Sequence, residues 1–176
     1  MWIAHYFSIK WWEDSFLLES LNIFTTHLFF KETNSNQTSS QITELIFDNF
    51  KTKAIVADKS SDHHPVWMQI NDSNDARILF DEITCFKGAS LFNYFYSLIG
   101  EQFWNNLGNF LNASRAHERL IFCELFFQYF ENIDITEKKY IPTMSKNTKI
   151  DTPSDELKFF LKNSKMSRLR CVIYIN

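Results

Sequence analysis

The fold is decided by the stretch WWEDSFLLESLNIFTTHLFFK, residues 11–31. Its apolar side chains recur every three or four positions, at Leu17, Leu21, Phe24 and Leu28, with Phe16 and Ile23 widening the stripe. That spacing places them on one face of an α-helix, which has about 3.6 residues per turn. Because a helix with so broad an apolar face must pack against other elements, the sequence predicts a helical core.

A second helix is predicted directly after this one. Residues 31–40 are rich in Asn, Thr and Ser, and Thr38 with Gln41 forms a capping-box pattern that opens a helix. The apolar positions of this second helix are Ile42, Leu45, Ile46 and Phe50. Two helices joined by a short polar link form a helical hairpin.

Three later segments are also predicted to be helical. Residues 89–99 form the first and end at Gly100, a residue type that often caps helix C-termini. Residues 103–111 form the next, and residues 118–131 are apolar nearly all round, which favours a buried helix. The apolar positions are Leu91, Phe95 and Leu98, then Phe103, Leu107, Phe110 and Leu111, then Leu120, Ile121, Phe122, Leu125, Phe126, Phe127 and Phe130.

Polar connectors and minor elements complete the pattern: a connector at residues 58–75, a loop at residues 133–154, a short amphipathic run at residues 156–162 and a strand at residues 171–175. Hydrophobic residues make up 45% of the chain, while Gly and Pro number three each, which disfavours disorder and turn-rich all-β folds. The predicted fold class is therefore mainly α, built on one core.

Charge and cysteine content exclude several classes of protein. The formal net charge is −3, so no strong positive field would attract nucleic acid, and nucleic-acid binding is not expected. Three widely spaced cysteines do not indicate a disulfide framework. No stretch reaches the ~18 apolar residues of a transmembrane helix, so the chain as written is expected to be soluble, and its compartment stays open.

Residues 2–19, WIAHYFSIKWWEDSFLLE, resemble the membrane alanyl aminopeptidase family of zinc metallopeptidases, which has H-E-x-x-H-Q-W-F-G-N-L-V-T-x-x-W-W-x-D-x-W-L-N-E-G. The match is ungapped. It sets Trp2 on the Trp of H-Q-W, Trp11 and Trp12 on the paired tryptophans, and Asp14 on the Asp. Glu19 then falls on the family's third zinc ligand, and the second zinc-binding His would lie immediately before the first residue.

A second block carries the same resemblance. Residues 64–66, HPV, and residues 80–90, FDEITCFKGAS, resemble the family's H-P-V and F-D-x-I-x-Y-x-K-G-A-S. The likeness continues to about Leu111, so residues 1–113 are interpreted as a partial zinc aminopeptidase catalytic domain. Residues 114–176 are interpreted as an unmatched C-terminal segment. The resemblance implies a multi-helix fragment of a thermolysin-like, gluzincin-type catalytic domain.

The resemblance also implies a degenerate catalytic site. Glu19 holds the position of one zinc ligand, but the two His and the general base of H-E-x-x-H do not occur in the chain. Cys85 stands where the family has an oxyanion-stabilising Tyr. One carboxylate cannot hold zinc at useful affinity, so zinc, the family's cofactor, is not expected to be retained. The chain by itself is therefore predicted to be inactive.

Three interpretations of function stay open. The chain is a fragment or degenerate member of the aminopeptidase family, a non-enzymatic module that binds peptides or proteins, or an active aminopeptidase whose N-terminal part is missing here. Peptides are the family's substrates, and self-association or pairing with a full-length relative is expected from apolar faces left uncovered. An N-terminal extension carrying H-E-x-x-H would decide for the third interpretation.

Two groups of residues have both a functional and a purely structural interpretation. Asp62, His63 and His64 could indicate a metal cluster, but adjacent side chains of an extended segment point to opposite faces, so a structural role is favoured. Cys85 could be a nucleophile, yet no neighbouring sequence supplies an activating base, which favours an inert thiol.

Overall fold

The structure is a computed structural model that describes residues 3–33, 37–61, 63–116 and 118–130. The helices are α1 (Ile3–Tyr6), α2 (Ser15–Thr33), α3 (Gln37–Asp58), α4 (Ser73–Ile78), α5 (Gly88–Ile99), α6 (Gln102–Ala116) and α7 (Cys123–Phe130), with a 3-10 turn η1 (Trp12–Asp14) and a π-helical turn η2 (Ile83–Lys87). Two short strands, β1 (Ser8–Ile9) and β2 (Leu120–Ile121), complete the described part. The mainly α fold class is confirmed.

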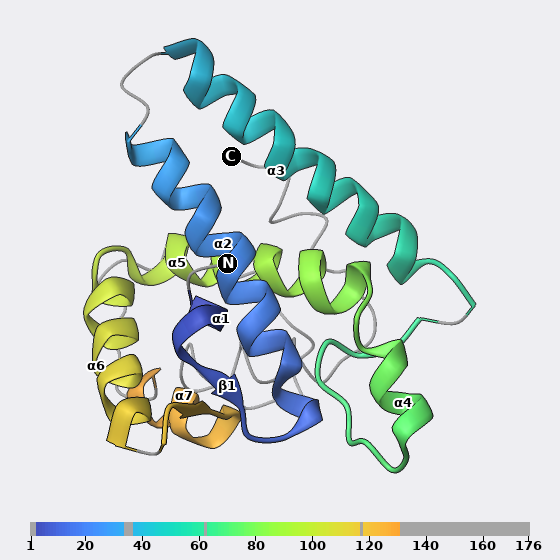
Figure 1. Cartoon of the computed structure of the whole chain (residues 1–176). Helices are drawn as coiled ribbons and strands as arrows, with labels where there is room; N and C mark the ends of the chain where they lie inside the picture. Colours follow the sequence, from blue (N-terminus) through green and yellow to red (C-terminus); the bar gives the residue numbers. More distant parts are fainter. Residues whose placement is uncertain (1–2, 34–36, 62, 117, 131–176) are drawn as a thin grey trace, which may run out of the picture.

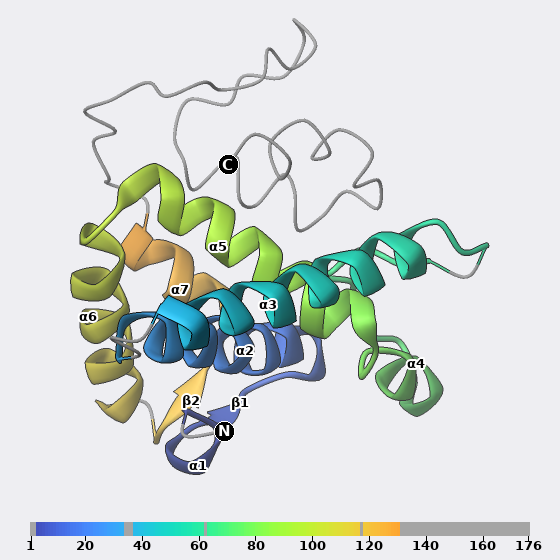
Figure 2. The same ribbon diagram turned by 90° about the horizontal axis from the view of Figure 1, so that it is seen from above.

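Helix α2 runs through the middle of the molecule, and α3 returns beside it along the outer edge (Figure 1). Seen from above, α5 covers α2 on one side, and α6 and α7 close one end (Figure 2). The helical hairpin predicted from the polar link at residues 31–40 is therefore present, as are the helices predicted over residues 89–99 and 103–111.

The core is largely a cluster of phenylalanine rings from α2, α5, α6 and α7. Phe24 of α2 meets Phe92 of α5 at a ring-centroid distance of 6.3 Å and Phe103 of α6 at 5.2 Å. Phe126 of α7 lies 5.6 Å from Phe92 and stacks on Phe130 at 4.4 Å. All five rings are buried, so the cluster ties the four helices into one core.

The helix predicted over residues 118–131 is wrong at its start. Glu118 and Arg119 have φ angles of 57° and 63°, which no α-helix accommodates. Residues 120–121 form β2 instead, which pairs in parallel with β1. The backbone N–H of Ser8 donates to the carbonyl of Arg119 at 3.0 Å. Pairing with β1, which is distant in sequence, therefore replaces the predicted first turn of the helix.

The predicted connector at residues 58–75 is partly helical, and the predicted C-terminal elements cannot be compared with the structure. Residues 58–75 were expected to be a connector, but α4 begins within them at Ser73, where Asp72 accepts hydrogen bonds from the backbone N–H groups of Asn74 and Asp75. The loop at residues 133–154, the run at residues 156–162 and the strand at residues 171–175 lie outside the described residues. Among the described helices, none combines the length and apolar character needed to cross a lipid bilayer.

Helix α2 approaches the junction of η2 and α5 so closely that one position there must be glycine. A Cβ atom added to Gly88 would overlap the Ser20 hydroxyl and lie 2.9 Å from Ser20 Cβ. The Ser20 hydroxyl donates to the backbone carbonyl of Thr84 at 2.6 Å and is buried. Close packing and a hydrogen bond therefore lock α2 against η2.

Helix α3 is held to the same junction by a buried ion pair. Lys87 Nζ, at the last residue of η2, contacts the carboxylate of Asp58 at the end of α3, and both side chains are buried. A buried charge that loses its partner is costly, so this contact strongly constrains where α3 ends.

We expect Gly88→Ala to destabilise the fold by about 1–3 kcal/mol, because the added methyl group overlaps Ser20 in a packed interface. Gly108→Ala is the matched control, since nothing lies within 4 Å of a Cβ at that position of α6. The control should gain ~0.5–1 kcal/mol from helix propensity. Urea unfolding followed by circular dichroism measures both, and equal effects at the two glycines would contradict the close approach.

We expect Asp58→Ala to cost about 3–5 kcal/mol, because it leaves the Lys87 ammonium buried without this carboxylate. The double variant Asp58→Leu with Lys87→Met should be less destabilised than the single variant, since no charge is then buried. Lys31→Met, which removes the solvent-exposed ion pair with Glu44, should change stability by less than ~1 kcal/mol. A double variant no more stable than Asp58→Ala would refute this account.

Candidate functional site

Glu19 lies in the first half of α2 and is partly exposed. The neighbouring residue, Ser20, is fixed by its hydrogen bond to Thr84. The N-terminal end of the helix is fixed too, because the buried Asp14 carboxylate accepts the backbone N–H of Cys123 at 3.1 Å. Glu19 therefore projects from a helix whose position is set on both sides of it.

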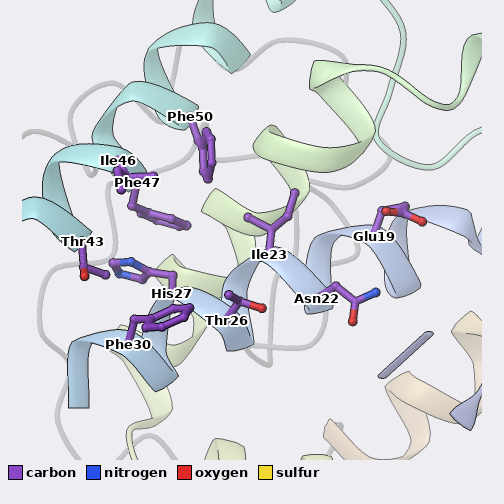
Figure 3. Close-up of a pocket in the computed structure, with 10 residues that line it drawn as sticks. All are labelled: Glu19, Asn22, Ile23, Thr26, His27, Phe30, Thr43, Ile46, Phe47 and Phe50. Atoms are coloured by element: carbon purple, nitrogen blue, oxygen red, sulfur yellow. The ribbon is translucent and has the colours of Figure 1, made fainter. Parts of the chain in front are cut away.

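Glu19 opens onto a cavity of about 540 Å³ between α2 and α3 (Figure 3). The cavity is lined by Glu19, Asn22, Ile23, Thr26, His27 and Phe30 of α2 and by Thr43, Ile46, Phe47 and Phe50 of α3. Most of this lining is apolar, with the Glu19 carboxylate at one end of the row of α2 residues and Phe30 at the other (Figure 3).

Two residues of the cavity wall carry buried polar atoms for which the described residues supply no partner. The side-chain oxygen and nitrogen of buried Asn22 have no hydrogen-bond partner within the described part of the chain, nor does Nδ1 of His27. Unsatisfied buried polar atoms are rare and often mark a place for a missing partner. Asn22 and His27 thus carry hydrogen-bonding atoms in the cavity wall that the described residues leave unsatisfied.

His27 is held as a neutral ring in the cavity wall. Its imidazole stacks on Phe47 at a centroid distance of 4.1 Å, and Nε2 lies 3.8 Å from a Glu44 carboxylate oxygen. Burial lowers the pKa of His27, and the nearby Glu44 charge opposes that effect without cancelling it. At neutral pH the ring is therefore uncharged.

Cys85 lies on η2 and is half-buried. Burial raises the pKa of its thiol to about 11, and the negative charges of Glu19, Asp81 and Glu82 act in the same direction. Glu19 and Cys85, the two site residues taken from the sequence, thus lie within electrostatic range of each other. At neutral pH Cys85 is a protonated thiol, a weak hydrogen-bond donor and a poor nucleophile.

His64 and Asp81 form a contact that was not predicted from the sequence. His64 Nε2 lies 3.1 Å from a carboxylate oxygen of Asp81, and His64 Nδ1 lies 2.7 Å from the carbonyl of Pro65. The other carboxylate oxygen of Asp81 accepts the backbone N–H groups of Ile83 and Thr84, each at 2.9 Å, at the start of η2. The two segments of the second family-like block, residues 64–66 and 80–90, thus meet to hold the turn that carries Cys85.

The two adjacent histidines serve different contacts. His63 Nδ1 lies 2.9 Å from the carbonyl of Ser60, at the end of α3, whereas His64 turns toward Asp81. The structural role predicted for His64 agrees with these contacts. Asp62, the third member of the candidate metal cluster, lies outside the described residues.

Comparison with known proteins decides the family. A family model described as the peptidase family M1 domain matches residues 1–147. The chain belongs to peptidase family M1. It is 29% identical over 101 residues to a leucyl aminopeptidase of Saccharolobus solfataricus, which covers 57% of this chain and 12% of that protein.

Other members of the family give the same result. A probable aminopeptidase 1 of Saccharolobus solfataricus is 29% identical over 113 residues, or 64% of this chain and 14% of that protein. Aminopeptidase N of Haemonchus contortus is 28% identical over 101 residues, or 57% of this chain and 10% of that protein. The M1 chain therefore spans a small part of these relatives, and no solved structure matches it significantly.

Zinc is the cofactor of the M1 family, but the described residues do not fit the ion. A zinc site needs about three protein ligands at ~2 Å from the metal. Glu19 and His27 share the cavity wall but lie eight residues apart on one helix, or about 12 Å along its axis. Within the described part of the chain, no group of three His, Cys, Asp or Glu residues is arranged so that it could hold a metal ion.

The His64–Asp81 contact predicts a pH-dependent stability. Burial works against the charge on both groups, but their mutual hydrogen bond and the backbone contacts raise the pKa of His64 above 6.5 and lower that of Asp81 below 3.8. The His64 contribution is present below pH 6.5 and is lost as the pH rises through its folded pKa. The Asp81 contribution is present above pH 3.8 and is lost as the pH falls through its folded pKa.

We expect the stability contributed by the His64–Asp81 contact to be greatest between about pH 4 and pH 6.5 and to fall on the alkaline side, whereas buried His27, with its lowered pKa, makes the fold less stable as the pH falls below 6.5. His64→Gln should remove the alkaline fall, because an amide does not titrate there. His5→Gln is the control, since His5 lies on the separate helix α1. Calorimetric melting from pH 4 to pH 9 tests this, and an unchanged alkaline fall in His64→Gln would contradict it.

Proposed function

We propose that this chain forms one side of a zinc aminopeptidase site and supplies Glu19 as a metal ligand to a segment that carries H-E-x-x-H. By itself the 176-residue chain does not hydrolyse peptides. The observation that carries the proposal is that Glu19 opens onto a cavity in which the described residues supply no further ligands for the same ion. Family M1 membership supplies the reaction class, metal-assisted hydrolysis of N-terminal peptide bonds.

The cavity favours an added protein segment over a small ligand as the missing part of the site. Its apolar walls, Ile23, Phe30 and Ile46 among them, would pack against the apolar face of a helix. Asn22 and His27 of its wall carry buried polar atoms without partners among the described residues, and a segment packed close against them would supply such partners. Because a zinc ion must lie ~2 Å from the Glu19 carboxylate, the two histidines would have to enter at the Glu19 end.

Cys85 is a second reason to expect low peptidase activity. A thiol is a shorter and weaker donor than the phenol that the family resemblance places here. With its pKa near 11, Cys85 also stays protonated at neutral pH, so it does not act as a thiolate nucleophile. Oxyanion stabilisation at this position would therefore be poor even in a completed site.

We expect the purified chain to bind no stoichiometric zinc after dialysis and to release no chromophore from aminoacyl anilides. One carboxylate gives too few ligands, and the general base of H-E-x-x-H is missing from this sequence. Metal analysis and a chelator-controlled assay measure the two quantities. Chelator-sensitive turnover by the unfused chain, or one tightly held zinc lost on Glu19→Ala, would refute the proposal.

The ligand assignment has its own test. A segment with H-E-x-x-H fused in register before Trp2 should restore zinc binding that depends on Glu19. In that fusion Cys85→Tyr should raise kcat by ~10²-fold or more, because it adds an oxyanion donor. Glu13→Ala is the matched carboxylate control, since Glu13 instead accepts the backbone N–H of Ile70 at 3.3 Å. Zinc binding that survives Glu19→Ala would reject the assignment.

A further inference from the structure

The outer face of α3 carries an apolar stripe that the cavity does not use. Ile42, Leu45 and Val56 are exposed to 53%, 70% and 65%. None of the three lines the α2–α3 cavity, to which α3 contributes Thr43, Ile46, Phe47 and Phe50. Single exposed apolar residues are common, but a row on one helix needs an explanation.

The stripe has heptad spacing. Together with the polar residues Asn49 and Thr52, the three apolar residues occupy positions 42, 45, 49, 52 and 56, whose intervals of three and four are those of the a and d positions of a two-stranded coiled coil. Phe47 and Ala54 then occupy the f positions, directly opposite, and both are buried against the rest of the molecule. Helix α3 is thus held by one face, the residues opposite that face are exposed, and the helix lies along the outer edge of the molecule (Figure 1).

Residue types along the stripe favour a second copy in parallel orientation. Ile42 and Val56 at a positions and Leu45 at a d position are the types found in parallel dimers. Asn49 occupies the central a position, where two copies in register would pair their side-chain amides. A partner in another register would set Asn49 against an apolar side chain.

Charges at the stripe's edges agree with the same orientation. Asp48 is at a g position and Lys53 at the following e position, the pair that meets between chains in a parallel coiled coil. Asp48 also accepts a hydrogen bond from Lys51 at 2.9 Å, and Lys53 Nζ lies 5.8 Å from the centre of the Phe86 ring. Both side chains are exposed, so each can still reach a second copy.

An antiparallel pairing of the two α3 helices would not bring Asp48 of one copy to Lys53 of the other. In that orientation g positions face g positions and e positions face e positions. Asp48 would then approach Ile55 or Gln41, and Lys53 would approach Ile46 or Ser60, with no opposite charge in reach. The charge pattern therefore distinguishes the two orientations.

We propose that two copies of this chain pair through the outer faces of α3, forming a short parallel coiled coil in which Asn49 sets the register and Asp48 of each copy meets Lys53 of the other. The proposal gives a defined surface to the self-association expected from the sequence. It is independent of the proposed function, since it uses neither Glu19 nor the cavity.

Sedimentation equilibrium of the full chain tests the pairing. We expect a dimer that Leu45→Lys weakens at least 10-fold, because the substitution sets two ammonium groups at one seam layer. Phe29→Lys is the matched control, since Phe29 is 59% exposed but lies on α2, off the seam. A monomeric unchanged chain, a trimer, or equal weakening by both variants would overturn the proposal.

Charge exchange tests the orientation. Asp48→Lys and Lys53→Asp should each weaken the dimer roughly 10-fold, because each creates two repulsive contacts. An equimolar mixture of the two variants should form a heterodimer close to the original affinity, since both contacts are attractive again. A mixture no tighter than the separate variants would overturn the parallel arrangement.

Cysteine cross-linking gives a second measurement of orientation. In the parallel seam Ile42 meets its own copy, so Ile42→Cys and Val56→Cys should each form a disulfide-linked dimer on mild oxidation. An antiparallel seam would separate the two residues 42 by about 20 Å and cross-link only a mixture of the variants. The unchanged chain, oxidised in parallel, measures the background from the native cysteines.

Discussion

The close contact between Ser20 of α2 and Gly88 at the start of α5 is the constraint on which the rest depends. A Cβ atom at residue 88 would overlap the Ser20 side chain, so Ser20 fills the space that glycine leaves open there. The turn η2 is π-helical, and the Ser20 hydroxyl donates a hydrogen bond to the backbone carbonyl of Thr84 within it. Since Glu19 precedes Ser20, this contact also fixes where the candidate metal ligand lies.

The neighbouring residue extends the same constraint to α3. Lys87 precedes Gly88 and reaches the opposite way, to Asp58 at the end of α3. Two consecutive residues of the K-G-A motif therefore hold two different helices, α3 through charge and α2 through close packing. Lys87 and Gly88 of this motif thus have structural roles at the junction of α2, α3 and α5.

The sequence predicted those parts of the fold that local spacing determines. The apolar stripes of α2, α3, α5 and α6 lie in single helices, and their periodicity was sufficient to predict them. The start of α7 was predicted wrongly, because the positive φ angles of Glu118 and Arg119 accompany a strand pairing with residues 8–9 that no local pattern indicates. Helix α4 was missed because six polar-rich residues give too little periodicity.

The candidate site likewise contains residues that the sequence predicted and contacts that only the structure shows. Motif register was enough to select Glu19 and Cys85, and the structure brings both to the α2–η2 junction. The Lys87–Asp58 and His64–Asp81 contacts span 29 and 17 residues and have no sequence period, so they needed the folded chain. The buried atoms of Asn22 and His27 that have no partner among the described residues could not be predicted either, because burial without a partner is a property of packing.

Helix α3 links the cavity to the outer surface. Its buried face, with Phe47 and Ala54, joins the core; the adjacent face, with Ile46, borders the cavity; and the opposite face carries the heptad stripe. The Lys87–Asp58 pair fixes the C-terminal end of α3, whereas the N-terminal half is tied to α2 by the exposed Lys31–Glu44 ion pair and by the stacking of Phe47 on His27 in the cavity wall. A segment that filled the cavity would therefore brace the half of α3 that carries Ile42 and Leu45. Filling the cavity and pairing through the outer face would then favour the same position of the helix.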